Sequence, residues 1–260
     1  MAYEFIKVER EGPVTVITLN RPEVMNALHS PAHFELHEAF DAFAADPEQW
    51  VGIVTGAGER AFSAGNDLKH QAGGGGMSSP PSGFAGLTSR FDLNKPLIAA
   101  VNGIAMGGGF EIALACDLIV AAEGAIFALP EPRVGLAALA GGLHRLPRMI
   151  GQKQAMGMIL TGRRVTAAEG QTLGFVNEVV PAAELLTAAR RWAAQICELS
   201  PMSIRASKEA VYKGLDEATL EDAIKGQMKY PAIGALFRSE DFKEGPMAFA
   251  QKRAPAWKGR

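Results

Sequence analysis

The chain has 260 residues, 48% hydrophobic and 21% charged, which is typical of a folded protein with one large domain or a core plus a small appendage. A formal net charge of −2 and a pI near 6.2 give no field that would attract nucleic acid or an anionic membrane. Cys116 and Cys197 stand far apart in the sequence and are expected to be buried free thiols. The sequence shows no signal-peptide pattern and no apolar run of about 18 residues, so we expect a cytoplasmic protein.

The first third of the chain predicts a hairpin followed by a helix. Residues 4–20 predict two short strands around a Gly12-Pro13 turn, because apolar residues alternate in the second half. Residues 30–46 predict a helix with Ser30 as N-cap and Pro31 at the first helical position. Its apolar stripes would be formed by Phe34, Leu36, Phe40 and Phe43.

The middle of the chain alternates between apolar strands and helices. Residues 50–56 and 95–103 predict buried strands, and glycine-rich residues 105–110 lead into a helix at 111–117. Residues 118–131 predict two more strands with a turn at Glu123 and Gly124. This alternation indicates an α/β fold.

Two zones differ from this pattern. Residues 70–83 form a loop rich in Gly, Ser and Pro, which we expect to be mobile and to lie beside the candidate site. From Ala182 onward the pattern is almost entirely helical. That segment is either packed on the α/β core or used for oligomerisation.

Three histidines, His29, His33 and His37, recur at intervals of four residues. The zinc-protease motif needs Glu directly after its first His, and Phe34 stands there instead. The pattern therefore favours the solvated face of an amphipathic helix over a metal site.

Two catalytic patterns are incomplete around residues 56–65. Gly56, Gly58 and Ala61 fit G-x-G-x-x-A, but no helix start follows, which disfavours a nicotinamide site. Residues 61–65 are one residue away from G-x-S-x-G. A serine hydrolase would use Ser63 as nucleophile with His144 as base, and the sequence around His144 gives this little support.

Glu111 is the most informative residue, because it lies within the apolar run at 105–115. A buried carboxylate must be paired, protonated or functional. An ion pair with an arginine from elsewhere in the fold is the ordinary explanation. Gly107, Gly108 and Gly109, however, would let backbone N–H groups at a helix start approach a ligand, as in an oxyanion hole.

A second carboxylate, Glu131, has a similar setting. It follows an apolar strand and stands between two prolines, which would fix the direction of its side chain. Two carboxyl groups in apolar surroundings suit acid–base catalysis, because burial raises their pKa values.

Several segments together resemble the enoyl-CoA hydratase/isomerase (crotonase) superfamily over essentially the whole chain. The segments that carry the resemblance are residues 20–28, 61–68, 95–122, 127–136, 140–148, 160–180 and 240–260. The resemblance implies an α/β, crotonase-like spiral of ββα units with a C-terminal helical region. It also implies a core at 1–195 that holds the active site, a region at 196–260 for oligomerisation and site closure, and a homotrimer or dimer of trimers.

The resemblance also implies roles for individual residues. Glu111 and Glu131 match the two catalytic carboxylates, and the N–H groups of Asn66 and Gly108 match the oxyanion hole. The CoA moiety would be lined by Met25, Asn26, Ala27, Leu28, Ala64, Gly65, Asp67 and Leu68. No metal or redox cofactor is required, since CoA arrives as part of the substrate.

The expected reaction is reversible addition of water across the 2,3 double bond of a 2-enoyl-CoA thioester. Alternatives are a double-bond isomerase that uses one glutamate, an acyl-CoA thioester hydrolase, and a non-catalytic RNA-binding or scaffold protein. The charge balance disfavours nucleic acid, and the presence of both glutamates disfavours loss of catalysis.

Residues 82–96, 127–131 and 249–260 are most similar to superfamily members that act on carnitine-derived CoA thioesters. One stretch departs from the superfamily pattern. Residues 137–140 precede the glycine pair where many hydratases carry Pro and then Gly or Asp, and Leu139 replaces a small or polar residue. If Leu139 borders the acyl pocket, an apolar acyl chain is expected in place of a carnitine-type head group.

Overall fold

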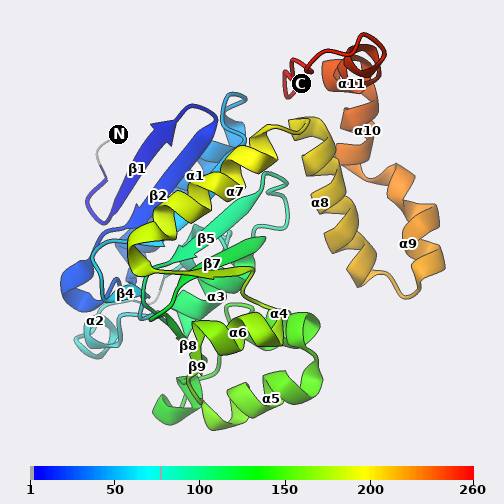
Figure 1. Cartoon of the computed structure of the whole chain (residues 1–260). Coiled ribbons are helices and arrows are strands. Elements are labelled where there is room, and N and C mark those ends of the chain that lie inside the picture. Colours follow the sequence, from blue (N-terminus) through cyan, green and yellow to red (C-terminus); the bar gives the residue numbers. More distant parts are fainter. Residues whose placement is uncertain (1–2, 77) are drawn as a thin grey trace.

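The computed structural model describes residues 3–76 and 78–260, so Met77, within the predicted loop at 70–83, lies outside the described residues. Two β-sheets and their covering helices form one body, and four helices extend to one side (Figure 1). This is the predicted α/β arrangement with a helical C-terminal region. The helices are α1 (Ser30–Ala45), α2 (Leu68–Ala72), α3 (Gly108–Ala115), α4 (Gly142–Ile150), α5 (Gln152–Thr161), α6 (Ala167–Leu173), α7 (Leu185–Cys197), α8 (Pro201–Asp216), α9 (Leu220–Gly226), α10 (Pro231–Arg238) and α11 (Glu240–Ala250).

The larger sheet has the order β1-β2-β3-β5-β7-β10 in the described chain. Its strands are β1 (Ile6–Glu11), β2 (Val14–Leu19), β3 (Val51–Gly56), β5 (Leu97–Val101), β7 (Leu118–Ala122) and β10 (Glu178–Val180). β1 and β2 form the predicted antiparallel hairpin around Gly12, whose φ of +59° suits glycine at a tight turn. The other pairings are parallel.

The smaller sheet has the order β4-β6-β8-β9, from β4 (Ala61–Ser63), β6 (Ile104–Met106), β8 (Ile126–Ala128) and β9 (Val165–Thr166). The chain steps between the sheets, so that β3, β5 and β7 are each followed by a short strand of the smaller sheet. This repeated step produces a spiral. The three-residue strands β4 and β6 were not predicted, because so short a segment shows no periodicity.

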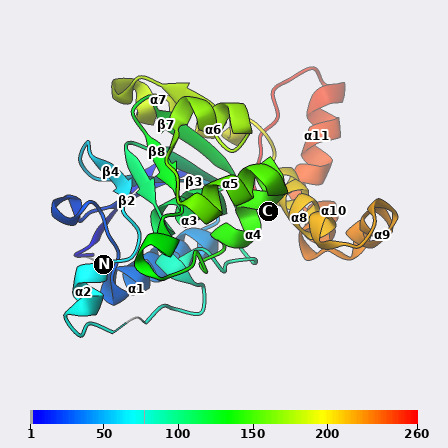
Figure 2. The ribbon, with the colours of Figure 1, turned by 90° about the horizontal axis from the view of Figure 1, so that it is seen from below.

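The larger sheet is covered on both faces. Val16, Ile53, Ile98 and Val120 pack with α7 in one apolar cluster. The alternate residues pack with α1 and α3 in the other cluster, because side chains of a strand alternate between faces. Figure 2 shows α7 and α1 on opposite sides of these strands. The central strands are therefore buried on both faces, as their apolar sequences predicted.

Helix α1 differs in two details from its prediction. Its N-cap is His29, and Ser30 is already helical. The Ser30 hydroxyl instead accepts a hydrogen bond from the N–H of Ser78 (2.8 Å) and donates one to the carbonyl of Gly76 (2.7 Å). Phe34 was expected in the apolar stripes and is 41% exposed.

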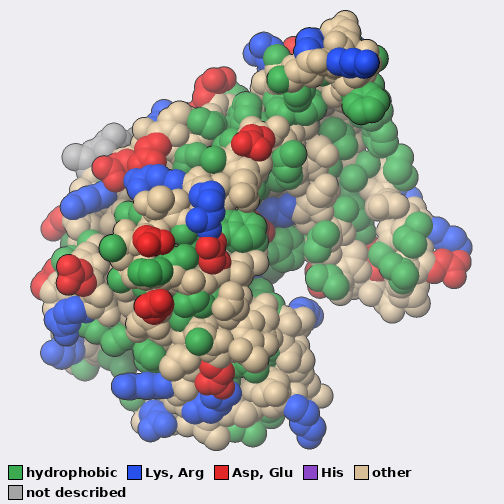
Figure 3. Space-filling view, in the orientation of Figure 1, with side chains coloured by type: hydrophobic (Ala, Val, Ile, Leu, Met, Phe, Trp, Pro, Cys, Tyr) green, Lys and Arg blue, Asp and Glu red, His purple; other side chains and the backbone are tan. Residues whose placement is uncertain are grey.

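The C-terminal helices α8 to α11 lie beside the core (Figure 1). The ammonium group of Lys208 on α8 donates to the carboxylate of Asp117 at 2.7 Å and to the carbonyl of Lys95 at 2.9 Å, which holds α8 against the core. Many apolar side chains of this region are exposed, as Figure 3 shows over its surface; they include Val211, Leu215, Leu220, Ile224, Met228, Phe237 and Phe249. In the described residues no helix combines the length and apolarity of a membrane span.

Candidate active site

A cavity of about 370 Å³ lies where α1, α3, residues 66–76, residues 78–89 and residues 131–140 meet. Six of the predicted catalytic, oxyanion-hole and substrate-binding residues line it: Asn66, Asp67, Gly108, Glu111, Glu131 and Leu139. Segments that are far apart in the sequence thus converge on one space.

Glu111 lies in the first turn of α3 and is 3% exposed. Its Oε1 accepts a hydrogen bond from the N–H of Gly142 at 2.8 Å. Among the ion pairs of the described residues Glu111 has no arginine partner, so the ion-pair explanation is not the one the structure adopts. Burial raises the pKa of Glu111 to about 7, with a smaller rise from the charge of Glu131 and an opposing effect of the Gly142 hydrogen bond.

Glu131 begins the 3-10 helix η3 (Glu131–Val134), directly after Pro130. Burial raises the pKa of its carboxyl group, and its Oε2 is buried without a partner in the described chain. A Cβ placed on Gly107 would come within 2.9 Å of Oε1, so this carboxyl group lies directly against the loop before α3. The cavity therefore holds two carboxyl groups whose pKa values are both raised by burial.

The backbone N–H groups of Asn66 and Gly108 lie on two loops in close contact. Gly65 has a φ of +87°, and a Cβ placed on it would come within 2.8 Å of the Gly108 nitrogen. Gly108 is the first residue of α3, where N–H groups have no intrahelical acceptor. Within the described residues, no hydrogen-bond acceptor is found for the N–H of either Asn66 or Gly108. Both donors are thus available to a ligand.

The segments expected to line CoA are joined by backbone hydrogen bonds. The N–H of Ala64 donates a hydrogen bond to the carbonyl oxygen of Met25. The N–H of Leu28 donates to the carbonyl oxygen of Gly65, and the N–H of Asp67 donates to the carbonyl oxygen of Leu28. These residues, apart from Asp67, do not line the main cavity. Leu68 lines a second cavity, which shares Gln71 and Leu136 with the first.

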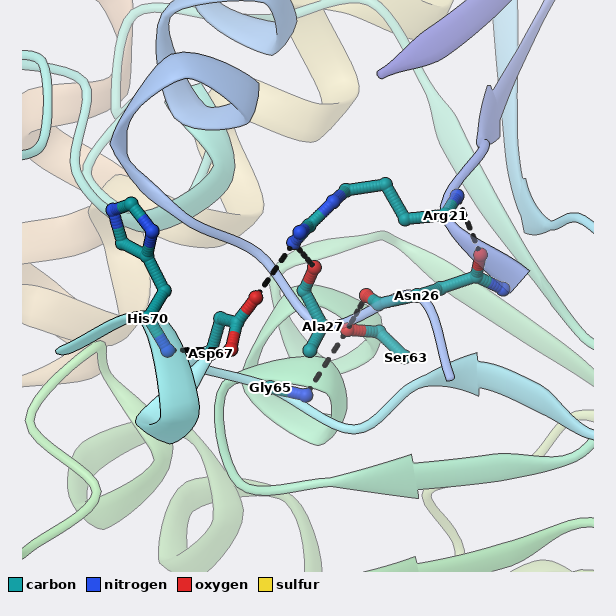
Figure 4. Close-up of polar contacts among 7 residues, drawn as sticks. All are labelled: Arg21, Asn26, Ala27, Ser63, Gly65, Asp67 and His70. Atoms are coloured by element: carbon teal, nitrogen blue, oxygen red, sulfur yellow. Dashed lines mark hydrogen bonds and ion pairs between the residues drawn. The ribbon is translucent and has the colours of Figure 1, made fainter. Parts of the chain in front are cut away.

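Side chains around these segments hold their shape. Asn26 has a φ of +53° and is fully buried, and its amide donates to the carbonyls of Ala57 (3.0 Å) and Ala61 (2.8 Å). Arg21 pairs with Asp67 at 3.0 Å and donates to the carbonyl of Ala27 (Figure 4). Burial raises the pKa of Asp67, but hydrogen bonds from the His70 N–H and from Arg21 outweigh it and lower the pKa overall.

Ser63, the nucleophile of the hydrolase alternative, has a structural role. It is fully buried, donates to the carbonyl of Asn26 at 2.8 Å and accepts from the N–H of Gly65 at 3.1 Å (Figure 4). The glycine-rich turn after β3 leads into strand β4 and not into a helix, as expected from the incomplete dinucleotide motif.

The interpretation of the histidines as a solvated helix face is wrong. His29 and His33 are 9% and 4% exposed and line the cavity, while His37 is partly buried against Ser82. A helix packed under a loop buries more of its surface than its own periodicity indicates.

No cluster of three or more potential metal ligands occurs in residues 3–76 and 78–260. Cys116 is buried as predicted, but Cys197 is only partly buried.

Sequence reasoning missed three neighbours of the site. The ring of Phe84 lies against Gly108, since a Cβ there would come within 2.6 Å of it. Thr88 has a buried Oγ1 without a described partner, and Gly142 supplies the N–H that binds Glu111. The glycine pair at 141–142 was visible in the sequence, but its partner was not.

Leu139 is 81% exposed at the cavity, so it is a rim residue. Much of the remaining wall carries hydroxyl, amide or imidazole groups, including Ser30, Gln71, Ser78, Ser79 and Ser89. This composition argues against an acyl pocket that is apolar throughout.

The sequence of this chain is similar to those of known proteins over nearly its whole length. Residues 9–260 match the sequence profile described as Enoyl-CoA hydratase/isomerase. The chain is 47% identical over 264 residues to a carnitinyl-CoA dehydratase of Salmonella typhi, covering 99% of each protein.

Solved structures give the same picture. An enoyl-CoA hydratase from Mycobacterium tuberculosis H37Rv superimposes with a TM-score of 0.91 at 38% identity, covering 98% of this chain and 99% of that one. A carnitinyl-CoA hydratase from Mycobacterium avium gives a TM-score of 0.78 at 41% identity, with the same coverage. The fold is thus shared with these proteins.

Proposed function

The chain belongs to the enoyl-CoA hydratase/isomerase family and is a hydratase-like hydro-lyase, and on this premise we propose how its cavity adds water to a 2-enoyl-CoA thioester. The observation that carries the proposal is the convergence of the buried carboxyl group of Glu111, the partly buried one of Glu131 and two unpaired backbone N–H groups on one cavity.

The N–H groups of Asn66 and Gly108 would bind the thioester carbonyl oxygen. Attack at C3 moves negative charge onto this oxygen, so these donors stabilise the transition state more than the ground state. Removing such a donor from an enzyme costs about 3 kcal/mol in the activation free energy. Because the two loops are fixed by backbone hydrogen bonds, the donors would need no rearrangement.

The two glutamates would divide the proton transfers. Glu111 accepts a proton from the attacking water as its oxygen bonds to C3, and Glu131 donates a proton to C2 of the resulting enolate. Dehydration reverses both transfers. A pKa of about 7 suits Glu111 to a base at neutral pH, and the raised pKa of Glu131 favours the protonated acid.

The CoA moiety would reach the site through the second cavity. Leu68, Val134 and Leu136 give this cavity an apolar wall, and Gln71 and Leu136 connect it to the main cavity. The backbone of the segments Met25–Leu28 and Ala64–Leu68 would then contact pantetheine and adenine, since their polar side chains are already engaged.

The proposal extends to the substrate and to the oligomeric state. Crotonobetainyl-CoA is the second candidate substrate, favoured by the identity to the Salmonella carnitinyl-CoA dehydratase. A homotrimer or dimer of trimers would bury the apolar side chains exposed on α8 to α11, since an apolar patch of this extent usually marks an interface.

Loss of the enoyl-thioester absorbance tests the proposal. Crotonyl-CoA and crotonobetainyl-CoA are incubated with the wild type and with Glu131→Gln. We expect rapid loss with at least one substrate and a decrease in kcat of about 10² to 10⁴ in the variant. Unchanged kcat in the variant contradicts the role of Glu131.

Two further assays separate the alternatives. A double-bond isomerase that uses Glu131 alone would remain active on a 3-enoyl-CoA after Glu111→Gln. A hydrolase would release free CoA thiol, which a thiol-reactive dye detects.

A further inference from the structure

Arg145 lies on α4, behind the part of the cavity wall that binds Glu111. Helix α4 begins at Gly142, whose N–H donates to Oε1 of Glu111 at 2.8 Å. The N–H of Arg145 donates to the carbonyl of Gly141 at 2.8 Å. The guanidinium group also lies against Gly141, because a Cβ placed there would collide with its Nη1. The Arg145 side chain and the Glu111 carboxyl group thus contact adjacent residues of one turn.

The same guanidinium group reaches a second part of the cavity wall. Its Nη2 donates to the carbonyl of Thr88, which lines the cavity, at 2.8 Å. The N–H of Thr88 donates to the carbonyl of Phe84 at 3.2 Å, and the ring of Phe84 lies against Gly108. Arg145 therefore joins the turn that binds the catalytic carboxyl group to the segment that packs on the oxyanion hole.

The charge of Arg145 is not neutralised by an ion pair in the described residues. Its guanidinium carbon lies 5.8 Å from the centroid of the Phe91 ring. Burial lowers the pKa of Arg145, and Tyr212, Cys116 and Glu111 act in the opposite direction. Burial also raises the pKa values of Cys116 and Tyr212, so both are neutral near pH 7. Glu111 is thus the ionisable carboxyl group on which this charge acts.

Two charged groups act on Glu111 from the elements around it, Glu131 and Arg145. Burial is the largest cause of the raised pKa of Glu111, and the charge of Glu131 raises it further. The backbone N–H groups of Gly142 and Ala140 and the charge of Arg145 lower it. Because the proposed base must be ionised to accept a proton, Arg145 favours the form that hydration uses.

We infer that Arg145 is a positioning residue, whose guanidinium group holds the turn at Gly141 and Gly142 against Thr88 and so aims the Glu111 carboxyl group at the attacking water. The inference rests on the proposed hydration. Arg145 is not among the residues that line the cavity, so it acts through this turn and not through contact with the substrate.

Arg145→Met tests the inference, since it removes the charge and the hydrogen bond to Thr88 but keeps an unbranched side chain. The values of kcat and KM are measured from pH 5 to pH 9 with the 2-enoyl-CoA thioester that the wild type hydrates fastest. We expect kcat to fall at least about tenfold while KM stays within about threefold, because the base is misplaced and substrate binding is not. The ascending limb of kcat against pH should move to higher pH by about half a unit or more, because the loss of a positive charge raises the pKa of Glu111.

Arg145→Lys separates the charge from the contacts. Lysine keeps the positive charge but lacks the planar group that contacts both Gly141 and Thr88. We expect a lower kcat, by about fivefold or more, with the ascending limb at its wild-type position. If Arg145→Met does not fold, as its thermal unfolding would show, the kcat of Arg145→Lys decides the test.

Arg148→Met is the matched control. Arg148 is an exposed residue of the same helix, and its guanidinium group donates to the carbonyl of His144 at 3.0 Å. This variant should leave kcat within about twofold of wild type and the pH profile unchanged, because Arg148 contacts neither the turn nor Thr88 in the described chain.

A wild-type kcat in Arg145→Met or in Arg145→Lys overturns the inference. A lowered kcat in Arg145→Met with an unmoved ascending limb also overturns it, because it indicates a contribution to stability alone. A KM that rises more than kcat falls indicates contact with the substrate and overturns it as well. Each of these outcomes leaves the hydration intact, whereas absence of hydration by the wild type overturns the proposed function and the inference with it.

Discussion

Replacing Glu111 with Gln should make the protein more stable at alkaline pH while abolishing hydration. The buried carboxyl group of Glu111 has a pKa of about 7 in the folded protein, against an ordinary value of 4.5. The folded protein therefore holds this proton more tightly than the unfolded chain does. The stability that Glu111 contributes is fully present below pH 4.5 and is lost as the pH rises through 7.

The size of this effect follows from the two pKa values. At about 1.4 kcal/mol per pH unit, the difference corresponds to about 3 kcal/mol of unfolding free energy between the acidic and alkaline limits. Gln cannot ionise, so the variant avoids this loss. Its Oε1 can still accept the hydrogen bond from Gly142, while any cost of burying the amide NH₂ is the same at every pH.

Thermal unfolding of wild type and Glu111→Gln at pH 5 and pH 8 measures the effect. The melting temperature of the variant relative to wild type should rise by about 5 to 10 °C between pH 5 and pH 8. Glu123→Gln is the control, because Glu123 is exposed and should give no such difference. An equal difference between variant and wild type at both pH values would refute the assignment of a raised pKa to Glu111.

Two glycine substitutions test the geometry of the site. Gly65→Ala places a Cβ at a φ of +87°, within 2.7 Å of the Met106 carbonyl and 2.8 Å of the Gly108 nitrogen. It should lower both the melting temperature, measured by thermal unfolding, and kcat, measured in a steady-state assay. The decrease in kcat should be at least tenfold, because the proposed oxyanion-hole donor would be displaced. Gly142→Ala places a Cβ 3.0 Å from Oε1 of Glu111 in a helical residue, and should lower kcat about tenfold with little change in melting temperature. Wild-type kcat in Gly65→Ala would contradict the close contact between Gly65 and the Gly108 nitrogen. Wild-type kcat in Gly142→Ala would contradict the close contact between Gly142 and Glu111.

The sequence predicted the elements whose residues form long or strongly patterned segments. The hairpin β1–β2, the buried strands β3, β5 and β7, and helix α1 lie where expected, whereas α3 begins at Gly108, within the glycine-rich stretch, and not at Glu111. The unusual position of Glu111 in an apolar run was enough to indicate a buried carboxyl group. Its raised pKa is the physical consequence of that burial.

The parts that sequence reasoning missed depend on contacts between distant segments. His33 receives a hydrogen bond from Ala85, 52 residues later, so its helical spacing alone could not show that it is buried. The same holds for Gly142, whose N–H binds Glu111 across 31 residues. Contacts of this kind leave no local signal in the sequence.

The proposed chemistry and the selectivity of this cavity depend on different kinds of contact. Glu111, Gly108 and Asn66 are positioned by glycines whose backbone lies too close to neighbours to accept a Cβ, so small changes there should affect every substrate alike. The wall formed by α1 and the loop after α2 is held by side chains, as in the bonds of Ser30 to residues 76 and 78. Substitutions on that wall can alter the acyl tail that binds without moving the reacting atoms.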